Sequence, residues 1–265
     1  MGQDAAVPKI DTSRPSVARA YDYLLGGKDN FAVDRAMAEQ ILKLYPQTAQ
    51  MCRDNRGFIV RAVAWAARQG IAQFLDLGSG LPTTPSVHEA VREVNPDARV
   101  CYVDNDPVAV LHIRALIVKG EGSGMAAAGQ DLSDAPAVLA DPDVASVISL
   151  GDPVCMVLAS VLHFWEAARA REIVGSYLSR MAPGSAVVIS CLRNDDPVLF
   201  GRSAESYTAA GVYNYTREEM ESLFSSLELV PPGLALAHAW RGGMATVPHK
   251  PTGTGYMLGG VGLKR

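Results

Sequence analysis

The segment from Phe74 to Gly80 constrains the fold of this chain more than any other part of the sequence. A mostly apolar run, Phe74 to Leu77, leads directly into the turn Gly78-Ser79-Gly80. A short apolar run of this kind is typical of a buried parallel strand. Glycines after it let the backbone turn tightly and approach a ligand, because they carry no Cβ. In open α/β sheets, ligands bind at the carboxyl ends of the strands, so this turn is a candidate binding site.

The residues after the turn argue against a ligand that carries phosphates. A dinucleotide site uses G-x-G-x-x-G, and Thr83 stands here where the third glycine belongs. Pro82 and Pro85 lack the backbone N–H donors that a pyrophosphate would need. The sequence contains no G-x-x-x-x-G-K-[ST] motif, which excludes a P-loop. Taken alone, the turn is equally consistent with a tight strand-to-helix connection that binds nothing.

Composition narrows the class of protein. The 265 residues are enough for one large α/β domain. A formal net charge of −4 gives no basic footprint, so we expect no nucleic-acid partner. No run of 18 apolar residues and no secretory signal occurs, so we expect no membrane partner and a cytoplasmic location. The cysteines are widely spaced, as expected of buried thiols in a reducing compartment: Cys52, Cys101, Cys155 and Cys191. The sequence leaves the oligomeric state open.

Short apolar runs alternate with helical stretches after Gly70, which predicts a parallel sheet with helices on both faces. The expected strands are residues 74–77, 100–103, 124–128, 154–158 and 186–190. The expected helices are residues 86–94, 107–118, 135–139, 166–181 and 216–227. Two last strands, 229–237 and 255–262, have no helix between them and therefore predict an antiparallel hairpin at one edge.

The first 70 residues have a different character. Residues 1–14 are polar and predict a loose arm. Apolar residues at helical spacing predict helices over 16–25 and 34–45 and a third one through 58–66 that ends at Gly70. The first helix breaks at Gly26-Gly27, which is consistent with a lid over the binding crevice or with an ordinary turn. We therefore expect an arm and helical lid over 1–70 and a binding domain over 71–265.

Polar residues follow the other strands where they end. Asp104 and Asn105 follow the second strand, and a carboxylate there can accept hydrogen bonds from a ribose diol. Asp131 and Leu132 follow the third strand, where an acid and an apolar side chain can flank a purine. Each acid also has a structural alternative: Asp104 could cap the turn before the next helix, and Asp131 the short helix that follows it.

The fourth strand is followed by Ala159-Ser160-Val161-Leu162-His163. Within the first strand, Asp76 either orients the glycine turn or meets an amino group of the ligand. The strand ends therefore offer sites for a ribose, a purine and a tail without phosphates.

These segments together resemble the class I S-adenosylmethionine-dependent methyltransferases. The resemblance runs from Phe74 to about Asn194 through FLDLGSG, VCYVDND, GQDL, VLASVLHFW and MAPGSAVVIS. It implies a Rossmann-like α/β fold with a mostly parallel seven-stranded sheet, and S-adenosyl-L-methionine as cofactor. It also implies the cofactor-binding residues: Asp76, Gly78, Ser79 and Gly80 at the methionine part, Asp104 at the ribose, Asn105, Asp131 and Leu132 at the adenine, and Ala159 and Ser160 beside the methionine.

A narrower resemblance covers nearly the whole chain. The N-terminal string RPSVARAYDYLLGGKDNFAVDR, with FLDLGSGLPT and YVDNDP, is similar to an actinobacterial family of S-adenosylmethionine-dependent methyltransferases whose substrates are largely unassigned. This resemblance favours the lid interpretation and adds Gly26 and Gly27 to the expected cofactor-binding residues. It does not supply a methyl acceptor.

Methyl transfer needs a general base only if the acceptor is protonated. His163 is the histidine at a strand end and is the first candidate, although a packed histidine beside Phe164 and Trp165 is the alternative. Tyr21, before the glycine break, is the second candidate. The Asn/Asp-Pro-Pro-aromatic motif of nucleobase and glutamine methyltransferases does not follow the fourth strand. We therefore expect a small-molecule acceptor, methylated on oxygen or nitrogen.

Two other functions stay open from the sequence. One is a non-catalytic S-adenosylmethionine-binding sensor or partner protein, and the other is an NAD-dependent oxidoreductase, which the missing third glycine disfavours. Asp195-Asp196 could hold a cation or form a solvated turn, and we expect no metal site.

Overall fold

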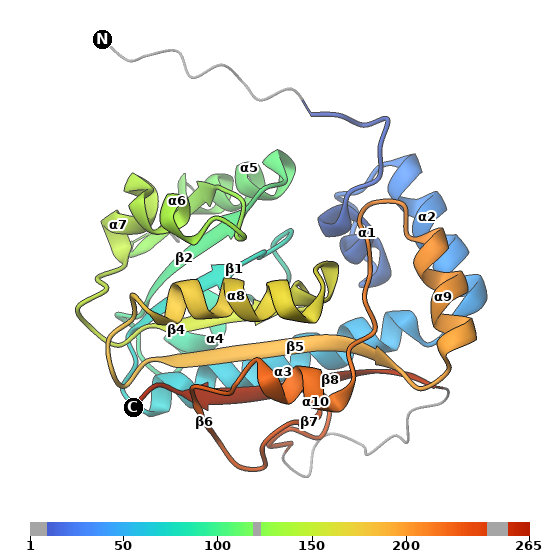
Figure 1. The fold of residues 1–265 in the computed structure, drawn as a ribbon. Helices are drawn as coiled ribbons and strands as arrows, with labels where there is room; N and C mark the ends of the chain where they lie inside the picture. The colour runs from blue at the N-terminus through green and yellow to red at the C-terminus, as the bar shows by residue number, and fades with distance from the viewer. Residues whose placement is uncertain (1–9, 119–122, 243–253) are drawn as a thin grey trace.

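The computed structural model describes residues 10–118, 123–242 and 254–265. Its centre is one eight-stranded sheet in the order β3-β2-β1-β4-β5-β8-β6, with β7 pairing on β8 (Figure 1). The strands are β1 Gln73–Leu77, β2 Arg99–Asp104, β3 Met125–Gly129, β4 Cys155–Ala159, β5 Ala186–Asn194, β6 Glu228–Leu229, β7 Ala235–Leu236 and β8 Gly255–Leu263. Strands β1 to β5 pair in parallel, and β8 pairs antiparallel with β5, β6 and β7. The predicted α/β class, with a mostly parallel sheet and antiparallel C-terminal strands, is confirmed.

The helices of the described residues are α1 Val17–Leu24, α2 Ala32–Leu44, α3 Thr48–Arg68, α4 Val87–Arg92, α5 Pro107–Leu116, α6 Ala135–Ala140, α7 Pro142–Val147, α8 Ala167–Leu178, α9 Pro197–Ser206 and α10 Arg217–Ser222. Helices α7 and α9 were not predicted. Helix α3 begins ten residues before Phe58, the first residue of the predicted periodicity. None of these helices is long and apolar enough to cross a membrane. Residues 1–9 of the expected arm lie outside the described residues.

The sheet has eight strands rather than seven because the expected strand 229–237 is interrupted. Pro231 and Pro232 lie in its middle and have no N–H to donate to a neighbouring strand, and Gly233 follows with φ +81°. Only the two-residue strands β6 and β7 remain on either side, and both pair with β8. The long strand β8 therefore lies between β5 and the short edge strand β6.

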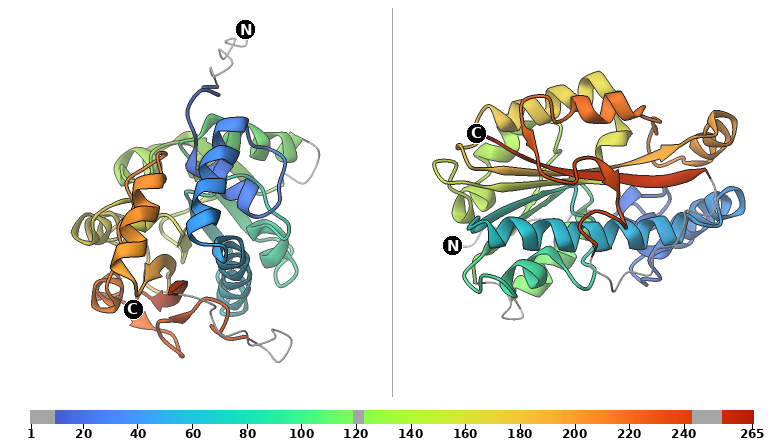
Figure 2. Two further views of the ribbon diagram at one scale, coloured as in Figure 1. Left: turned by 90° about the vertical axis from the view of Figure 1, so that its right-hand side faces the viewer. Right: turned by 90° about the horizontal axis from the view of Figure 1, so that it is seen from below.

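Helices cover both faces of the sheet, so that two hydrophobic cores form (Figure 2, right). Successive side chains of a strand point to opposite faces. In β1, Phe74 packs with α3, α4 and α5, whereas Leu75 and Leu77 pack with α6, α7 and α8. The same alternation places Asp76 on the side of Phe74, toward α3. Helix α3 thus belongs to the layers around the sheet, although it lies before the expected domain boundary at residue 70.

The direction of the connections reverses at β1. Strands β2 and β3 lie on one side of β1, and β4 and β5 lie on the other. In such sheets, the crevice at the carboxyl ends of the two strands that flank the reversal is where ligands bind. Helices α1, α2 and α9 gather at one end of the sheet, on the right of Figure 1. The glycine turn after β1 and Ser160 after β4 therefore meet at this crevice.

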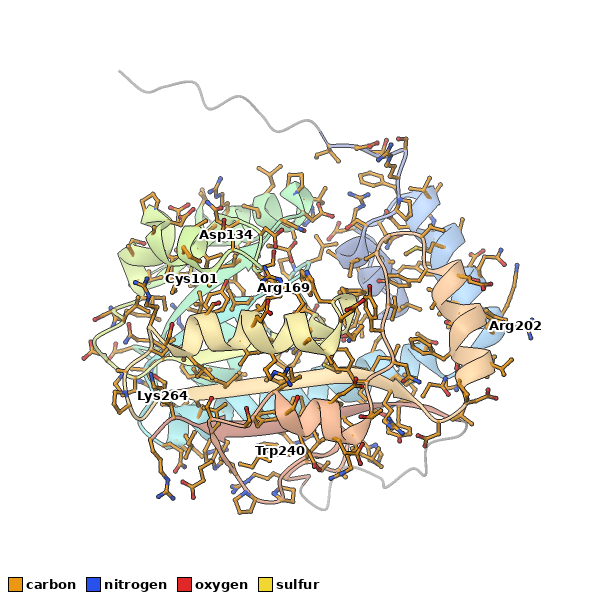
Figure 3. All side chains as sticks on the ribbon, in the orientation of Figure 1. Cys101, Asp134, Arg169, Arg202, Trp240 and Lys264 are labelled. Atoms are coloured by element: carbon orange, nitrogen blue, oxygen red, sulfur yellow. The ribbon has the colours of Figure 1, made fainter. Side chains whose placement is uncertain are left out.

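Helix α3 packs closely on β8, and a substitution at this contact should change the stability of the protein. A Cβ on Gly259 would lie 2.7 Å from Cζ of Phe58. The buried ring of Phe58 contacts Trp240, which is labelled in Figure 3, edge-on with 5.5 Å between centroids. We expect Gly259→Ala to lower the free energy of unfolding by about 1–3 kcal/mol, since neither ring has room to move. The control is Gly201→Ala, inside α9, where nothing lies within 4 Å of the new Cβ. In chemical denaturation, this variant should unfold with an unchanged or higher free energy of unfolding. Equal stabilities of the two variants would contradict this packing.

Candidate functional site

A cavity of about 610 Å³ opens at the carboxyl ends of β1, β2, β3 and β4. It brings together every cofactor-binding residue expected from the strand ends: Asp76, Gly78, Ser79, Gly80, Asp104, Asn105, Asp131, Leu132, Ala159 and Ser160. Acids outnumber bases among the charged residues that line it. The cavity therefore favours a ligand with net positive charge.

The glycine turn is held in place by β2. The backbone N–H groups of Gly78 and Ser79 donate to the carbonyl of Val103, over 2.8 and 3.1 Å. Gly80 donates its N–H to Oδ2 of Asp104 over 2.7 Å. Gly78 has φ +71° and a Cβ there would lie 2.5 Å from Cγ1 of Val161, so only glycine fits this position.

Asp104 both organises the turn and faces the cavity. Its Oδ1 accepts the N–H of Asp106 over 2.8 Å, and Oδ2 accepts from Gly80. Burial raises the pKa of this carboxyl, and the backbone donors oppose that shift. The cap of α5 is Asp106, whose Oδ1 accepts the N–H of Val108. A carboxylate has about four lone-pair sites, so Asp104 keeps acceptor capacity for a hydroxyl of a ligand.

Asp76 does not hold the glycine turn. Among the described residues, no group donates a hydrogen bond to it, and the turn is held by Asp104 and Val103 instead. Burial raises the pKa of Asp76 to about 7, which Arg56 opposes and the nearby Asp104 reinforces. The acid thus offers an unpaired carboxyl to the cavity.

Two further polar atoms at this end of the cavity have no partner. They are Nε of Arg56, from α3, and Oγ of Ser79, and both are buried. Buried polar groups are nearly always hydrogen-bonded, so unpaired ones at a cavity mark atoms that a ligand can satisfy. An acid, a guanidinium and a hydroxyl together fit the ammonium and carboxylate of an amino acid.

Asp131, Leu132 and Asn105 also line the cavity. Oδ1 of Asp131 accepts the N–H of Ser133 over 2.8 Å. The cap of α6 is Asp134, whose Oδ1 accepts the N–H of Ala137 over 3.0 Å (Figure 3). The capping role considered for Asp131 therefore belongs to Asp134, and Asp131 keeps its second oxygen for a ligand.

Ser160 adopts a left-handed conformation with φ +60°, which is uncommon for a residue other than glycine and is found at functional sites. Its N–H donates to the carbonyl and to the hydroxyl of Ser190, over 2.9 and 3.1 Å. The Ser190 hydroxyl donates to Oδ1 of Asn55 over 2.5 Å, and Nδ2 of Asn55 donates to the Tyr21 hydroxyl over 3.1 Å. A continuous hydrogen-bonded chain thus links the end of β4 through α3 to α1.

The N-terminal segment forms one wall of the cavity, which includes Tyr21 but not the two glycines expected there. Asp11, the residues from Arg14 to Arg19, and Tyr21 line it. Gly26 and Gly27 line neither this cavity nor the chamber described next. They end α1, where the N–H of Gly27 donates to the carbonyl of Asp22 over 2.8 Å. The part of the N-terminal region that lines the cavity is therefore the segment before the glycines.

A buried ion-pair network fixes that segment, and we call it the Arg19 latch. Nε of Arg19 donates to Oδ2 of Asp34 over 2.9 Å, and Nη1 donates to Oδ2 of Asp106 over 3.4 Å. Nη2 of Arg19 donates to the carbonyl of Arg14 over 2.8 Å. The Ser16 hydroxyl also donates to Asp106. The latch joins α1 and α2 to the N-terminus of α5, beside Asp104.

A second, smaller chamber of about 110 Å³ adjoins the cavity, and residues common to both are Val17, Tyr21, Ser160 and Phe164. His163 lines this chamber and not the first cavity. Its Nδ1 accepts the N–H of Leu192 over 3.3 Å. Burial lowers the pKa of His163 to about 4, so the imidazole is neutral at pH 7. Tyr207, which follows α9, lines the same chamber.

Tyr21 lies where the two spaces meet. Its hydroxyl donates to the carbonyl of Cys52 over 3.1 Å and accepts from Asn55. Burial raises its pKa far above neutral, so its phenol stays protonated. At pH 7 Tyr21 can fix the junction of the two spaces but cannot take up a proton.

Asp195 and Asp196 have structural partners. Asp195 pairs with Arg193 over 3.0 Å, and Asp196 caps α9 by accepting the N–H groups of Val198 and Leu199. The described residues contain no group of three or more His, Cys, Asp or Glu that could hold a metal ion.

The sequence reasoning missed Asn55, Arg56 and Arg19. Arg19 lies in a predicted helix but off its apolar face, and Asn55 and Arg56 precede the third helix as it was predicted. Asn55 and Arg19 are nevertheless 1% and 4% exposed. Polar side chains are rarely buried without a partner, so their burial here is a result of tertiary packing that no local pattern marks.

Comparisons with known proteins bear on this site. A family model described as S-adenosyl methyltransferase matches residues 3–265. A protein of Thermobifida fusca YX that carries a provisional methyltransferase designation is 36% identical, with a TM-score of 0.89 over 99% of this chain and 100% of that chain. A DUF574 family protein of Streptomyces avermitilis MA-4680 is 33% identical, with a TM-score of 0.90 over 97% of this chain and 100% of that chain.

Human N-acetylserotonin methyltransferase, solved in complex with SAM, is 13% identical with a TM-score of 0.50, over 95% of this chain and 63% of that chain. This last similarity concerns the fold alone. No curated protein sequence matches the chain.

Proposed function

This chain belongs to the S-adenosyl methyltransferase family, and we propose that its two adjoining spaces hold S-adenosylmethionine and a small-molecule methyl acceptor. One observation carries the proposal. Residues from four strand ends line a single cavity at the reversal of the sheet, and that cavity adjoins an uncharged chamber. Family membership counts against an NAD-dependent oxidoreductase and against a purely non-catalytic binder.

The unpaired groups of the cavity fit the cofactor. Asp104 would accept hydrogen bonds from the ribose diol, and Asn105, Asp131 and Leu132 would flank the adenine. The open space above Gly80, which has φ +66° and nothing within 4 Å of a Cβ, leaves room for the backbone to approach the ligand. Asp76 would take the ammonium group, and Arg56 with Ser79 the carboxylate. Each partnerless buried atom at this end then gains a partner.

The chain itself contributes positioning and exclusion of water. S-adenosylmethionine supplies the electrophilic methyl group when it is bound. Tyr21 and Ser160 lie in both spaces and would align the acceptor with that methyl group. The segment from Arg14 to Arg19 lines the cavity and would keep water out. The four cysteines are free and buried, which supports the cytoplasmic location expected from the sequence.

The direct test is calorimetric titration of the full chain with S-adenosylmethionine, together with a thermal shift. We expect saturable binding to one site. No heat and no shift would refute the proposal. A radiolabelled methyl group transferred to a panel of small phenols, alcohols and amines would then test turnover.

Asp76 gives the binding a pH dependence. Below about pH 7 its carboxyl is protonated and cannot pair with the ammonium of the cofactor, because its pKa is raised to about 7. Affinity is therefore expected to rise with pH, by at most about tenfold per unit below pH 7, and to level off above it. Calorimetry between about pH 5.5 and 7.5 measures this slope. Asp76→Asn should bind weakly and without the slope, whereas an unchanged slope in that variant would assign the proton to another group.

A further inference from the structure

The acceptor chamber has a composition that restricts what can enter it. Its lining contains no Asp, Glu, Lys or Arg among the described residues. Apolar side chains come from α1, α2, α3, α9 and β8, among them Leu24, Ile41, Met51, Phe200 and Met257. The first cavity, by contrast, is lined by several acids and arginines. Moving a charge into such a chamber without a partner is strongly unfavourable.

The titratable groups of the chamber are all neutral at pH 7. Burial raises the pKa of Cys52 to about 12 and raises the pKa of Tyr21, Tyr45 and Tyr207 above the ordinary value of a phenol. His163 is neutral as well. The chamber therefore has no charge of its own to offer to an ionic acceptor, and no group in it is a base of ordinary strength near pH 7.

The tautomer of His163 follows from its neighbours. Nδ1 accepts the N–H of Leu192, so we assign the ring proton to Nε2. No described residue accepts from Nε2. The ring lies against Phe164 with 4.6 Å between centroids, and Phe164 stacks on Tyr207 at 5.8 Å. The one donor of His163 is thus left for a molecule in the chamber, beside an aromatic wall.

The volume of the chamber limits the size of that molecule, and α9 forms one wall of the chamber. A volume of about 110 Å³ is comparable to that of apolar cavities that bind benzene, about 150 Å³. Helix α9 forms one wall and has no buried residue, although Phe200, Ser203 and Ala204 line the chamber. Arg202 extends from α9 away from the body of the protein (Figure 3). Phe200, Ser203 and Ala204 are thus only half-buried, and they leave surface of α9 facing the chamber.

We propose that the methyl acceptor is an uncharged, mainly apolar molecule about the size of one substituted aromatic ring, and that His163 holds it as a hydrogen-bond donor through Nε2 rather than acting as the general base. In the transfer, a lone pair of the acceptor would form the bond to the methyl carbon as the methyl–sulfur bond breaks, which leaves neutral S-adenosylhomocysteine. The proton of the methylated oxygen or nitrogen would then pass to water. This inference rests on the proposed function, because it names the acceptor class of the same site. His163 is then a specificity-determining residue, since its donor selects molecules with an oxygen or nitrogen acceptor at that point.

The test compares three probes of nearly equal shape on the full chain with S-adenosylhomocysteine bound. They are benzamide, which is neutral, benzoate, which is an anion, and benzylamine, which is a cation at neutral pH. We expect ligand-observed NMR to give a benzamide affinity at least about tenfold higher than that of either charged probe. Ala204→Phe, which fills the chamber, should abolish benzamide binding and leave the affinity for S-adenosylmethionine unchanged.

Variants at His163 test the donor. His163→Phe should weaken benzamide binding by about tenfold, the effect of one lost hydrogen bond, while His163→Gln, which keeps an N–H donor, should restore most of it. Both variants should bind S-adenosylmethionine normally, which shows that they are folded. Nitrogen-15 NMR of the imidazole should show the Nε2–H tautomer and no titration between about pH 6 and 8.

Three results would overturn the inference: equal binding of benzoate and benzamide, normal benzamide binding by His163→Phe, or titration of His163 near pH 7. Failure of the proposed function would look different. In that case the unaltered protein would show no heat with S-adenosylmethionine at all.

Discussion

Replacing Asp104 with alanine is expected to weaken the binding of S-adenosylmethionine by roughly 100-fold or more. Two losses add up in this variant. The ribose diol loses its acceptor, and the N–H groups of Gly80 and Asp106, now held over 2.7 and 2.8 Å, lose theirs. Hydrogen bonds to a charged group contribute about 1.5–3 kcal/mol each, so losing even one or two of them gives an effect of this size.

Two matched variants separate the contributions. Asp104→Asn keeps one acceptor oxygen and the shape of the side chain, so its loss of affinity should be intermediate. Asp97→Ala removes an exposed acid near the start of the same strand and should bind normally. Isothermal calorimetry gives the three affinities, and circular dichroism confirms that the proteins are folded. If Asp104→Ala binds S-adenosylmethionine with unchanged affinity, Asp104 does not belong to the binding site. The assignment of Gly80, which donates to Asp104, would then be weakened as well.

The strand-end residues could be predicted because a local pattern determines them. Each apolar run of the parallel sheet ends where polar residues begin, and parallel strands end at the same edge of the sheet. Asp104, Asp131 and Ser160 were therefore expected to meet, and they line one cavity. The sequence could not show that Asp104, and not Asp76, holds the turn. It depends on which carboxylate reaches the N–H of Gly80, a contact over 24 positions of the sequence.

The residues that sequence reasoning missed are those whose role comes from tertiary packing. Asn55 and Arg56 reach the crevice because α3 packs across the sheet and begins earlier than its apolar spacing indicated. Helix α9 buries no residue, so it lacks the continuous apolar stripe by which a helix is predicted. Gly26 and Gly27 line neither space, whereas Val17 and Tyr21, earlier in α1, line both. A glycine pair shows where a helix ends, but not which part of that helix lies at the cavity.

Breaking the Arg19 latch should have the second large effect. Arg19 and its partners Asp34 and Asp106 are nearly fully buried, with side-chain exposures of 5%, 0% and 8%. Arg19→Met keeps most of the apolar stem but leaves two buried carboxylates without their cation. Removing one partner of a buried ion pair costs about 3–5 kcal/mol, and we expect a loss of this size in the free energy of unfolding. Arg169→Met, which removes an exposed pair with Glu172, should cost less than about 1 kcal/mol.

The latch also connects stability to cofactor binding. Asp106 caps α5 two residues after Asp104, and the segment from Arg14 to Arg19 lines the cavity. If the latch holds this segment closed, Arg19→Met should raise the dissociation rate of S-adenosylmethionine more than it lowers the association rate, because an open segment no longer encloses the bound molecule. Stopped-flow measurement of the two rates tests this. If the variant loses stability but releases S-adenosylmethionine no faster, the latch contributes to folding only. If its free energy of unfolding is unchanged, the buried ion-pair network is contradicted.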